Sequence, residues 1–358
     1  MEVEVEVKGK GEVKVEVEVE VEGYRYLLIC VYRSEKTMLN RLNGLILKLM
    51  QPDWESYKKG LLAGDRRSLA RTISLVENEA AGHEEFLKGL PPAHVPVIGI
   101  TGPPGAGKST LTDGLVQQLV ARQNKVGVLC VDPSSPFNMG ALLGDRIRMS
   151  SLYLHPDIYI RSLASRGSLG GLHPRIIEII DVMKRAGFDY IVVETVGVGQ
   201  SEIEIAGLAD CTVVVLVPEA GDEIQTMKAG LMEIADLFVV NKADRPEADL
   251  FVNNLRKMLA PVFARDHSLP VIKTVAIKKQ GLEELAEAVL HILAKPETHE
   301  KRQWLLAEKA WQLLVHKRMK GITRSKLKNA IDREYSANFN LYAFVEQMEN
   351  AAYFNDMK

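Results

Sequence analysis

The chain has 358 residues and a formal net charge of -2, and 46% of its residues are hydrophobic and 26% charged. This composition is typical of a soluble globular protein that can bury a sizeable core. The nearly balanced charge argues against a global electrostatic attraction to nucleic acid or to an anionic membrane.

The N-terminal 37 residues differ from the rest of the chain. Residues 2–22 alternate Val with Glu or Lys and are interrupted around Gly9 and Gly11. This period-two pattern predicts a β-hairpin with one charged face, which alone is marginally stable in water. We therefore expect residues 1–37 to be a low-complexity tail outside the fold, and Met38 to be a candidate start of the natural chain.

The segment 38–92 is predicted to be an N-terminal helical segment. Apolar residues recur at helical spacing until Pro91 and Pro92 end the pattern. The residues of this stripe are Leu61, Leu62, Leu69, Ile73 and Val76.

Residues 93–296 alternate short β-branched runs with helical stretches. The runs are 95–101, 125–132, 158–163, 190–195, 212–217, 237–241 and 271–276. Nearly continuous apolar strands joined by helices predict an α/β fold, with a doubly wound, mostly parallel sheet covered on both faces. Ligands of such sheets bind at the carboxyl ends of the strands.

The C-terminal region 297–358 is predicted to be a helical arm over 299–320 and 340–352. Its apolar side chains include Trp304, Leu305, Leu306, Trp311, Leu313 and Leu314. From the residues alone, this stripe either packs on its own domain or pairs with a second subunit.

The first chemical motif is GPPGAGKS at residues 102–109, which follows the first predicted strand and matches G-x-x-x-x-G-K-[ST]. Its glycines let backbone N–H groups surround phosphate oxygens, and the following helix directs its positive end at them. Lys108 is expected to reach the β- and γ-phosphates, and the Ser109 hydroxyl to ligate Mg²⁺. The expected phosphate-binding residues are Gly102, Pro103, Pro104, Gly105, Ala106, Gly107, Lys108, Ser109 and Thr110.

The second motif, Asn241-Lys242-Ala243-Asp244, ends the strand predicted at 237–241. A carboxylate at Asp244 accepts hydrogen bonds from the ring N–H and the exocyclic amine of guanine, a donor pair that adenine lacks. Lys242 is expected to lay its stem on the base, and Asn241 to tie this loop to the phosphate loop. The two motifs together predict a GTPase that binds GTP and GDP.

Between the two motifs, Glu194 ends another strand and is followed by Gly197 and Gln200. An acid at this position is expected to meet Mg²⁺, and Gly197 to approach the γ-phosphate. Gln200 either orients the attacking water or is an exposed turn residue. We assign Lys108, Glu194 and Gln200 as candidate catalytic residues.

Two further acids, Asp132 and Asp145, are candidates to complete a Mg²⁺ site with Ser109 and Glu194, although both also suit helix N-caps. Val275 and Ala276 end the last strand, where GTPases present backbone N–H groups to the guanine carbonyl.

Other sites are disfavoured by the residue pattern. The three cysteines form no CxxC pair and the eight histidines form no HxxxH or HExxH pattern, so neither a zinc nor an iron–sulfur site is expected. The apolar run at 26–32 is too short to span a bilayer, and the acidic N-terminus lacks a signal or transit pattern. We expect a cytoplasmic protein without a nucleic-acid or membrane partner.

From about residue 54 to 294 the chain resembles the MeaB/ArgK-type P-loop GTPases. The resemblance rests on the collinear motifs GITGPPGAGKST, VDPSSPF, LGDRIRM, ASRGSLGGL, ETVGVGQSE, AGDEIQTMKAG and NKAD. These proteins are chaperones of adenosylcobalamin-dependent methylmalonyl-CoA mutase, formerly described as transport-system kinases. The resemblance implies Mg²⁺ ligation by Ser109, Asp132, Asp145 and Glu194, a homodimer formed through the helical arm, and a mutase partner whose cofactor loading is gated.

The same resemblance implies an additional switch segment at 219–228, with Asp222, Gln225 and Lys228 as its polar members. Hydrolysis without a partner is expected to be slow, on the order of 10⁻⁴ to 10⁻² s⁻¹, and to be stimulated by the partner.

This chain departs from the family pattern at several positions. Glu219 replaces a usual Gly, Ser168 a usual His, and Val275 a usual Ser, and the segment around Met139 is bulkier. These positions concern switching and partner contact more than nucleotide binding.

Two alternatives are a metal-delivery GTPase of the nickel-enzyme type and a nucleotide-binding scaffold without hydrolysis. The first type tends to carry His-rich or Cys-His metal sites, which this sequence lacks. A kinase acting on a transport protein is disfavoured, because Asp244 points to guanine.

Overall fold

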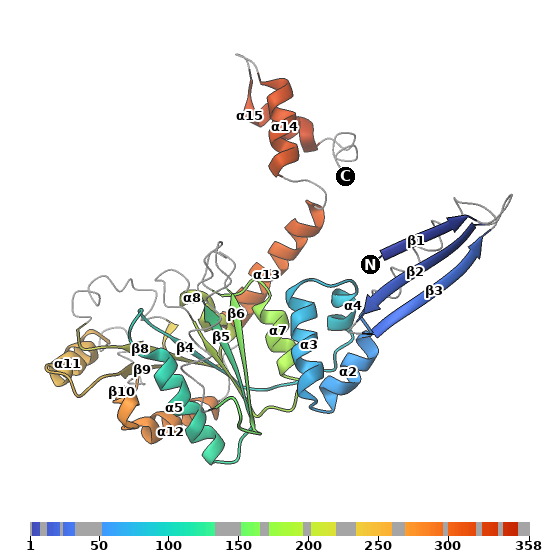
Figure 1. Ribbon diagram of the computed structural model, residues 1–358. Coiled ribbons are helices and arrows are strands. Elements are labelled where there is room, and N and C mark those ends of the chain that lie inside the picture. The colour runs from blue at the N-terminus through green and yellow to red at the C-terminus, as the bar shows by residue number, and fades with distance from the viewer. Residues whose placement is uncertain are drawn as a thin grey trace.

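The computed structural model describes residues 2–7, 13–21, 24–32, 52–132, 152–164, 172–195, 202–219, 234–259, 269–295, 300–319, 324–335 and 339–349. Its central element is a seven-stranded sheet with the strand order β10-β9-β8-β4-β7-β5-β6, and every neighbouring pair is parallel (Figure 1). The predicted doubly wound parallel α/β fold is therefore confirmed. The strands are β4 (Val97–Thr101), β5 (Val126–Asp132), β6 (Ile158–Ala164), β7 (Tyr190–Glu194), β8 (Cys211–Leu216), β9 (Leu237–Val240) and β10 (Val271–Lys273).

Helices cover both faces of this sheet because alternate residues of each buried strand point to opposite sides. On one face, Ile98 and Val213 pack with Leu115 of α5 (Lys108–Ala121) and Leu285 of α12 (Leu282–Leu293). The other face is covered by α7 (Ile176–Met183), α8 (Glu202–Leu208) and the N-terminal helices, and near β9 by α11 (Ala248–Leu259).

The predicted N-terminal helical segment contains α2 (Trp54–Leu62), α3 (Arg66–Glu77) and α4 (His83–Lys88). Asp53 and Asp65 begin α2 and α3 by accepting hydrogen bonds from the backbone N–H groups of Ser56 and Ser68. Four residues of the predicted stripe are buried and join the core under α7, but Leu62 is 50% exposed. Leu62 points outward because it lies next to Leu61 in the last turn of α2, and adjacent helical residues do not share a face. The buried four are Leu61, Leu69, Ile73 and Val76.

Three strands within the first 32 residues form a separate antiparallel sheet. Strands β1 (Glu2–Val7) and β2 (Val13–Val21) pair as the predicted hairpin, and β3 (Tyr24–Tyr32) adds a third strand. This sheet shares no strand with the seven-stranded sheet, and in the picture it extends away from the N-terminal helices (Figure 1).

The C-terminal helices are α13 (Glu300–Arg318), α14 (Arg324–Glu334) and α15 (Leu341–Glu349). The first part of α13 packs beside α8, and α14 and α15 lie beyond its end, away from the large sheet (Figure 1). Leu305 is partly buried and packs against the core, whereas Trp304 and Trp311 are 74% and 64% exposed. One side of the predicted apolar stripe thus covers its own domain and another side faces outward.

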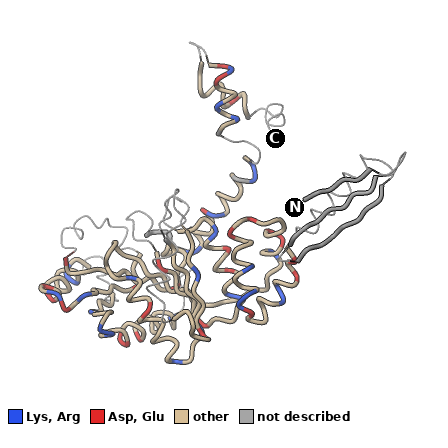
Figure 2. The backbone as a smooth tube through the Cα atoms, in the orientation of Figure 1, with Lys and Arg blue, Asp and Glu red and all other residues tan. Residues whose placement is uncertain are grey.

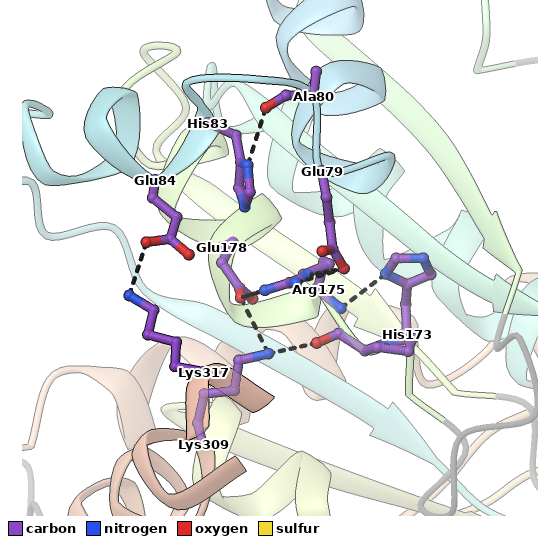
Figure 3. Close-up of polar contacts among 10 residues, drawn as sticks. Glu79, Ala80, His83, Glu84, His173, Arg175, Glu178, Lys309 and Lys317 are labelled. Carbon is purple, nitrogen blue, oxygen red and sulfur yellow. Dashed lines mark hydrogen bonds and ion pairs between the residues drawn. The ribbon is translucent and has the colours of Figure 1, made fainter. Parts of the chain in front are cut away.

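A polar cluster attaches α13 to the rest of the fold (Figure 3). Lys309 lies 3.1 Å from Glu178 of α7 and donates to the carbonyl of Pro174 at 2.6 Å. Arg175 pairs with Glu178 and Glu79, and Lys317 pairs with Glu84 of α4 at 2.8 Å. Charged residues lie mainly on the helices and loops, while the strands of the large sheet carry few of them (Figure 2).

Within the described residues, no helix is long and apolar enough to cross a membrane.

Candidate nucleotide-binding site

The loop between β4 and α5 is held closely against its neighbours. Gly102 has a φ of 142°, and a Cβ there would lie 2.1 Å from the carbonyl oxygen of Val215 in β8. Gly107 has a φ of 86°, and a Cβ there would lie 2.5 Å from Asn241 Nδ2. Glycine is required at both positions because of the left-handed backbone and the close approach. The loop therefore packs directly on β8 and on the loop that follows β9.

Lys108 lies inside this loop. Its side-chain Nζ donates hydrogen bonds to the carbonyl oxygens of Gly102 at 2.8 Å and of Pro103 at 3.1 Å, and the residue is only 7% exposed. The Thr112 hydroxyl donates to the Lys108 carbonyl at 2.9 Å. The ammonium group is thus held at the N-terminal end of α5, where the helix dipole favours anions.

Ser109 and Glu194 meet at the carboxyl ends of the central strands. The Ser109 hydroxyl donates to Glu194 Oε1 at 2.6 Å, and Glu194 is 7% exposed. Glu194 stands opposite Ile100 of β4 and Cys130 of β5 in the sheet register. Hydroxyl and carboxylate oxygens are the ligands that Mg²⁺ prefers, so the pair fits one side of a magnesium site.

The other predicted magnesium ligands are only partly described. Asp132 ends β5, two residues beyond the partner of Glu194, but its side chain is not described. Asp145, Gly197 and Gln200 lie outside the described residues, as do Ser168, Met139, Asp222, Gln225 and Lys228. Over the ranges that are described, no three His, Cys, Asp or Glu residues form a metal-holding group. The complete magnesium set and the catalytic role of Gln200 stay predictions.

Asn241 joins the two nucleotide motifs. Its Nδ2 donates to the Ala106 carbonyl in the phosphate loop at 2.9 Å, which confirms the predicted tie between the loops. Its Oδ1 accepts from the Thr274 hydroxyl and from the Ala276 N–H, both at 3.1 Å. Because Asn241 is only 3% exposed, these bonds lie in the interior and hold three segments together.

The backbone N–H groups predicted to read the guanine carbonyl already have partners in the chain. The N–H of Val275 donates to the carbonyl of Gln280 at 3.1 Å, and that of Ala276 donates to Asn241. Their contact with a base stays a prediction.

Asp244, the predicted guanine reader, has a partner that the sequence reasoning missed. Lys278 Nζ donates to Asp244 Oδ2 at 2.8 Å, and this hydrogen bond lowers the pKa of the carboxyl. A signal for the pair exists in the sequence, since adjacent parallel strands end at the same edge of a sheet. An acid after β9 and a lysine after β10 are therefore expected to meet.

Glu219, one of the departures from the family pattern, contacts the same loop. Its carboxylate accepts a hydrogen bond from Arg245, the residue after Asp244, and this contact lowers the Glu219 pKa. The start of the predicted switch segment is thus attached to the predicted base-reading loop.

Comparison with known proteins places this geometry in a family. Residues 69–328 match the family model described as methylmalonyl-CoA mutase-associated GTPase MeaB. The GTPase ArgK of Escherichia coli is 37% identical over 241 residues, which are 64% of this chain and 73% of that protein. The fused isobutyryl-CoA mutase of Geobacillus kaustophilus is 40% identical over 233 residues, 60% of this chain but 21% of that protein.

A solved structure agrees. The crystal structure of an LAO/AO transport system kinase has a TM-score of 0.59 and 26% sequence identity, and the match covers 83% of this chain and 98% of that one. The matched family region includes the phosphate loop, Glu194 and the Asn241–Asp244 loop. The chain belongs to the MeaB family of methylmalonyl-CoA mutase-associated GTPases.

Proposed function

We propose that this protein binds GTP and GDP with Mg²⁺, hydrolyses GTP, and acts as a chaperone of an adenosylcobalamin-dependent acyl-CoA mutase. The observation that carries the nucleotide part is the position of Asn241, which bonds the phosphate loop at Ala106 and the segment after β10 at Ala276. These bonds support the proposal that Lys108, Asp244 and the pair Ser109–Glu194 act in one site at the carboxyl edge of the sheet.

In this site each residue has one task. Lys108 neutralises phosphate charge, and the loop N–H groups surround the phosphates. Asp244 reads guanine, and Lys242 supports the base with its stem. Ser109 and Glu194, together with Asp132 and Asp145, would hold Mg²⁺, which would supply positive charge against the phosphates.

Hydrolysis is tested by steady-state release of phosphate from GTP. We expect slow turnover by the wild type, on the order of 10⁻⁴ to 10⁻² s⁻¹, and none by Lys108→Ala. GDP binding with no phosphate release from the wild type would instead identify a nucleotide-binding scaffold.

The magnesium site is tested by measuring GDP affinity with Mg²⁺ and with EDTA. Ser109→Ala is expected to abolish the gain that Mg²⁺ gives, because the hydroxyl ligand is removed, whereas Ser109→Thr is expected to keep it. An equal Mg²⁺ effect in Ser109→Ala and the wild type would contradict the assignment.

The mutase part rests on the family and on the fused relative, in which a region similar to this chain occurs inside an isobutyryl-CoA mutase. In the proposal, nucleotide state gates cofactor loading and protects the mutase. We expect a cobalamin-dependent acyl-CoA mutase to co-purify from the native host with the tagged protein, in an amount that depends on a non-hydrolysable GTP analogue. Failure to recover any such mutase would overturn the chaperone role and leave the GTPase role intact.

A further inference from the structure

The segment after β10 contains Val275 and Ala276, the residues predicted to read the guanine carbonyl, and it is closed by its own backbone hydrogen bonds. Val275 and Gln280 exchange backbone hydrogen bonds at 3.1 and 3.3 Å, and a short 3-10 helix, η2 (Ala276–Lys278), lies between them. Lys279 has a φ of 56° and donates from Nζ to Gln117 of α5 at 2.8 Å. The paired backbone groups of Val275 and Gln280 set the course of the loop that carries Lys278, while the Lys279 side chain contacts the helix that follows the phosphate loop.

Lys278 pairs with the Asp244 carboxylate from this loop. Its Nζ lies 2.8 Å from Oδ2, and the two side chains are 56% and 40% exposed. Arg245 directly follows Asp244 in the sequence, but its side chain pairs with Glu219 instead. Among the ion pairs of the described residues, Lys278 is therefore the cation that engages the predicted guanine reader.

An ammonium group on one oxygen does not block the site. An ionised carboxylate has about four acceptor positions on its two oxygens, so Oδ2 can accept from Lys278 and from a base at the same time. Guanine presents two parallel donors, the ring N–H and the 2-amino group, and pairs with both only when the carboxylate lies in the plane of the base. A hydrogen bond that fixes the rotation of the carboxylate favours this bidentate geometry.

We propose that Lys278 is a positioning residue for guanine specificity, which orients the Asp244 carboxylate for bidentate contact with the base. The inference rests on the proposed role of Asp244. It predicts that loss of the ammonium group weakens the contact to the 2-amino group in particular, and not nucleotide binding in general.

The test measures the affinities of the full-length protein for GDP and for inosine diphosphate, which lacks the 2-amino group. The variant is Lys278→Met, which keeps most of the side-chain length and removes the charge. Because exposed charge pairs are weak, we expect GDP binding to weaken by about two- to fivefold. Inosine diphosphate binding should change less, so the ratio of the two affinities falls. Lys278→Arg is expected to restore the ratio.

The matched control is Lys279→Met, which removes a charge from the same loop but from a side chain that bonds Gln117. It should leave the ratio at the wild-type value. Unchanged or tighter GDP binding by Lys278→Met would overturn the inference. Weaker binding of both nucleotides with an unchanged ratio of the GDP and inosine diphosphate affinities would also overturn it, because a general loosening of the loop has that effect. Equal affinity of the wild type for GDP and ADP would instead refute the guanine assignment of Asp244, a separate result.

Discussion

At the scale of single residues, Asn241 joins three segments of the candidate nucleotide site. Its amide makes one donated and two accepted hydrogen bonds, to Ala106, Thr274 and Ala276, in an interior position. Removing the amide leaves buried partners unsatisfied, and each unsatisfied group costs about 1–3 kcal/mol. Asn241 therefore links stability to the geometry of the site.

We predict that Asn241→Ala lowers the free energy of unfolding by about 2–4 kcal/mol and weakens GDP binding. Urea denaturation without nucleotide and titration with GDP measure the two effects. Asn78→Ala is the control, because Asn78 lies on the surface at the end of α3 and bonds the carbonyl of Ser74. A midpoint for Asn241→Ala equal to that of the wild type would refute the role.

At the scale of elements, the N-terminal helices are part of the core and not an appendage. Leu61 of α2 is fully buried in the cluster that contains α7 and the strand residues Val97 and Val193. The next residue, Leu62, is half exposed. This pair allows the same substitution at a packed and at an open position.

We predict that Leu61→Ala destabilises the protein by about 3 kcal/mol, since deletion of a buried leucine leaves a cavity. Leu62→Ala is expected to stay within about 0.5 kcal/mol. Equal unfolding midpoints for the two variants would show that α2 does not contribute to the core.

The junction between α7 and α13 contains a buried lysine. Lys184 ends α7 and is 9% exposed, and burial, followed by the nearby Arg302, lowers its pKa from the ordinary 10.5. Arg302 itself pairs with Asp210, whose other oxygen accepts from the Val97 N–H that begins β4. The cluster connects the start of α13 to the strand that leads into the phosphate loop.

The pKa shift of Lys184 has a definite sign in stability. The unfolded chain binds the Lys184 proton more tightly than the folded protein does, because its lysine keeps the ordinary pKa of 10.5. The shift therefore lowers the free energy of unfolding at neutral pH, and this loss disappears as the pH rises toward 10.5. We predict that Lys184→Met is more stable than the wild type at pH 7 and that the difference shrinks by pH 10, measured by denaturation at both values. Lys88→Met should show the opposite sign, because the hydrogen bond to Glu85 raises the pKa of Lys88. A wild type more stable than Lys184→Met at pH 7 would contradict the assignment.

At the scale of the whole molecule, the outward side of α13 bears on the proposed homodimer. Trp304, Trp311 and Leu314 are 74%, 64% and 59% exposed and lie seven and three residues apart, which places them near one face of the helix. Exposed aromatic residues are enriched at protein interfaces. We propose that this face pairs with a second copy.

We predict that Trp311→Glu weakens self-association, since a charge would be buried in an apolar interface. Sedimentation velocity over a range of protein concentrations measures this. Gln312→Glu adds the same charge at the adjacent exposed position and should leave the dimer intact. A wild type that stays monomeric, or a Trp311→Glu dimer of wild-type affinity, would refute the arm as the interface.

Much of the fold and part of the site were predictable from the sequence alone. Buried parallel strands are continuous apolar runs, and the phosphate loop and the Asn241–Asp244 motif are local patterns whose position after strands follows from the topology of the sheet. These features identified the α/β fold and the GTPase family, and they predicted the tie between Asn241 and the phosphate loop.

Only the tertiary structure decided which distant residues meet. It paired Lys278 with Asp244 and Glu219 with Arg245, and it gave the N–H groups of Val275 and Ala276 partners within the chain. It also turned Leu62 and Trp311 outward, while Leu61 is buried and Leu305 packs against the core. The physical reason is that local patterns fix the backbone and its periodicity, whereas contacts between side chains depend on how the loops after neighbouring strands approach each other. That approach is set by the packing of the whole domain.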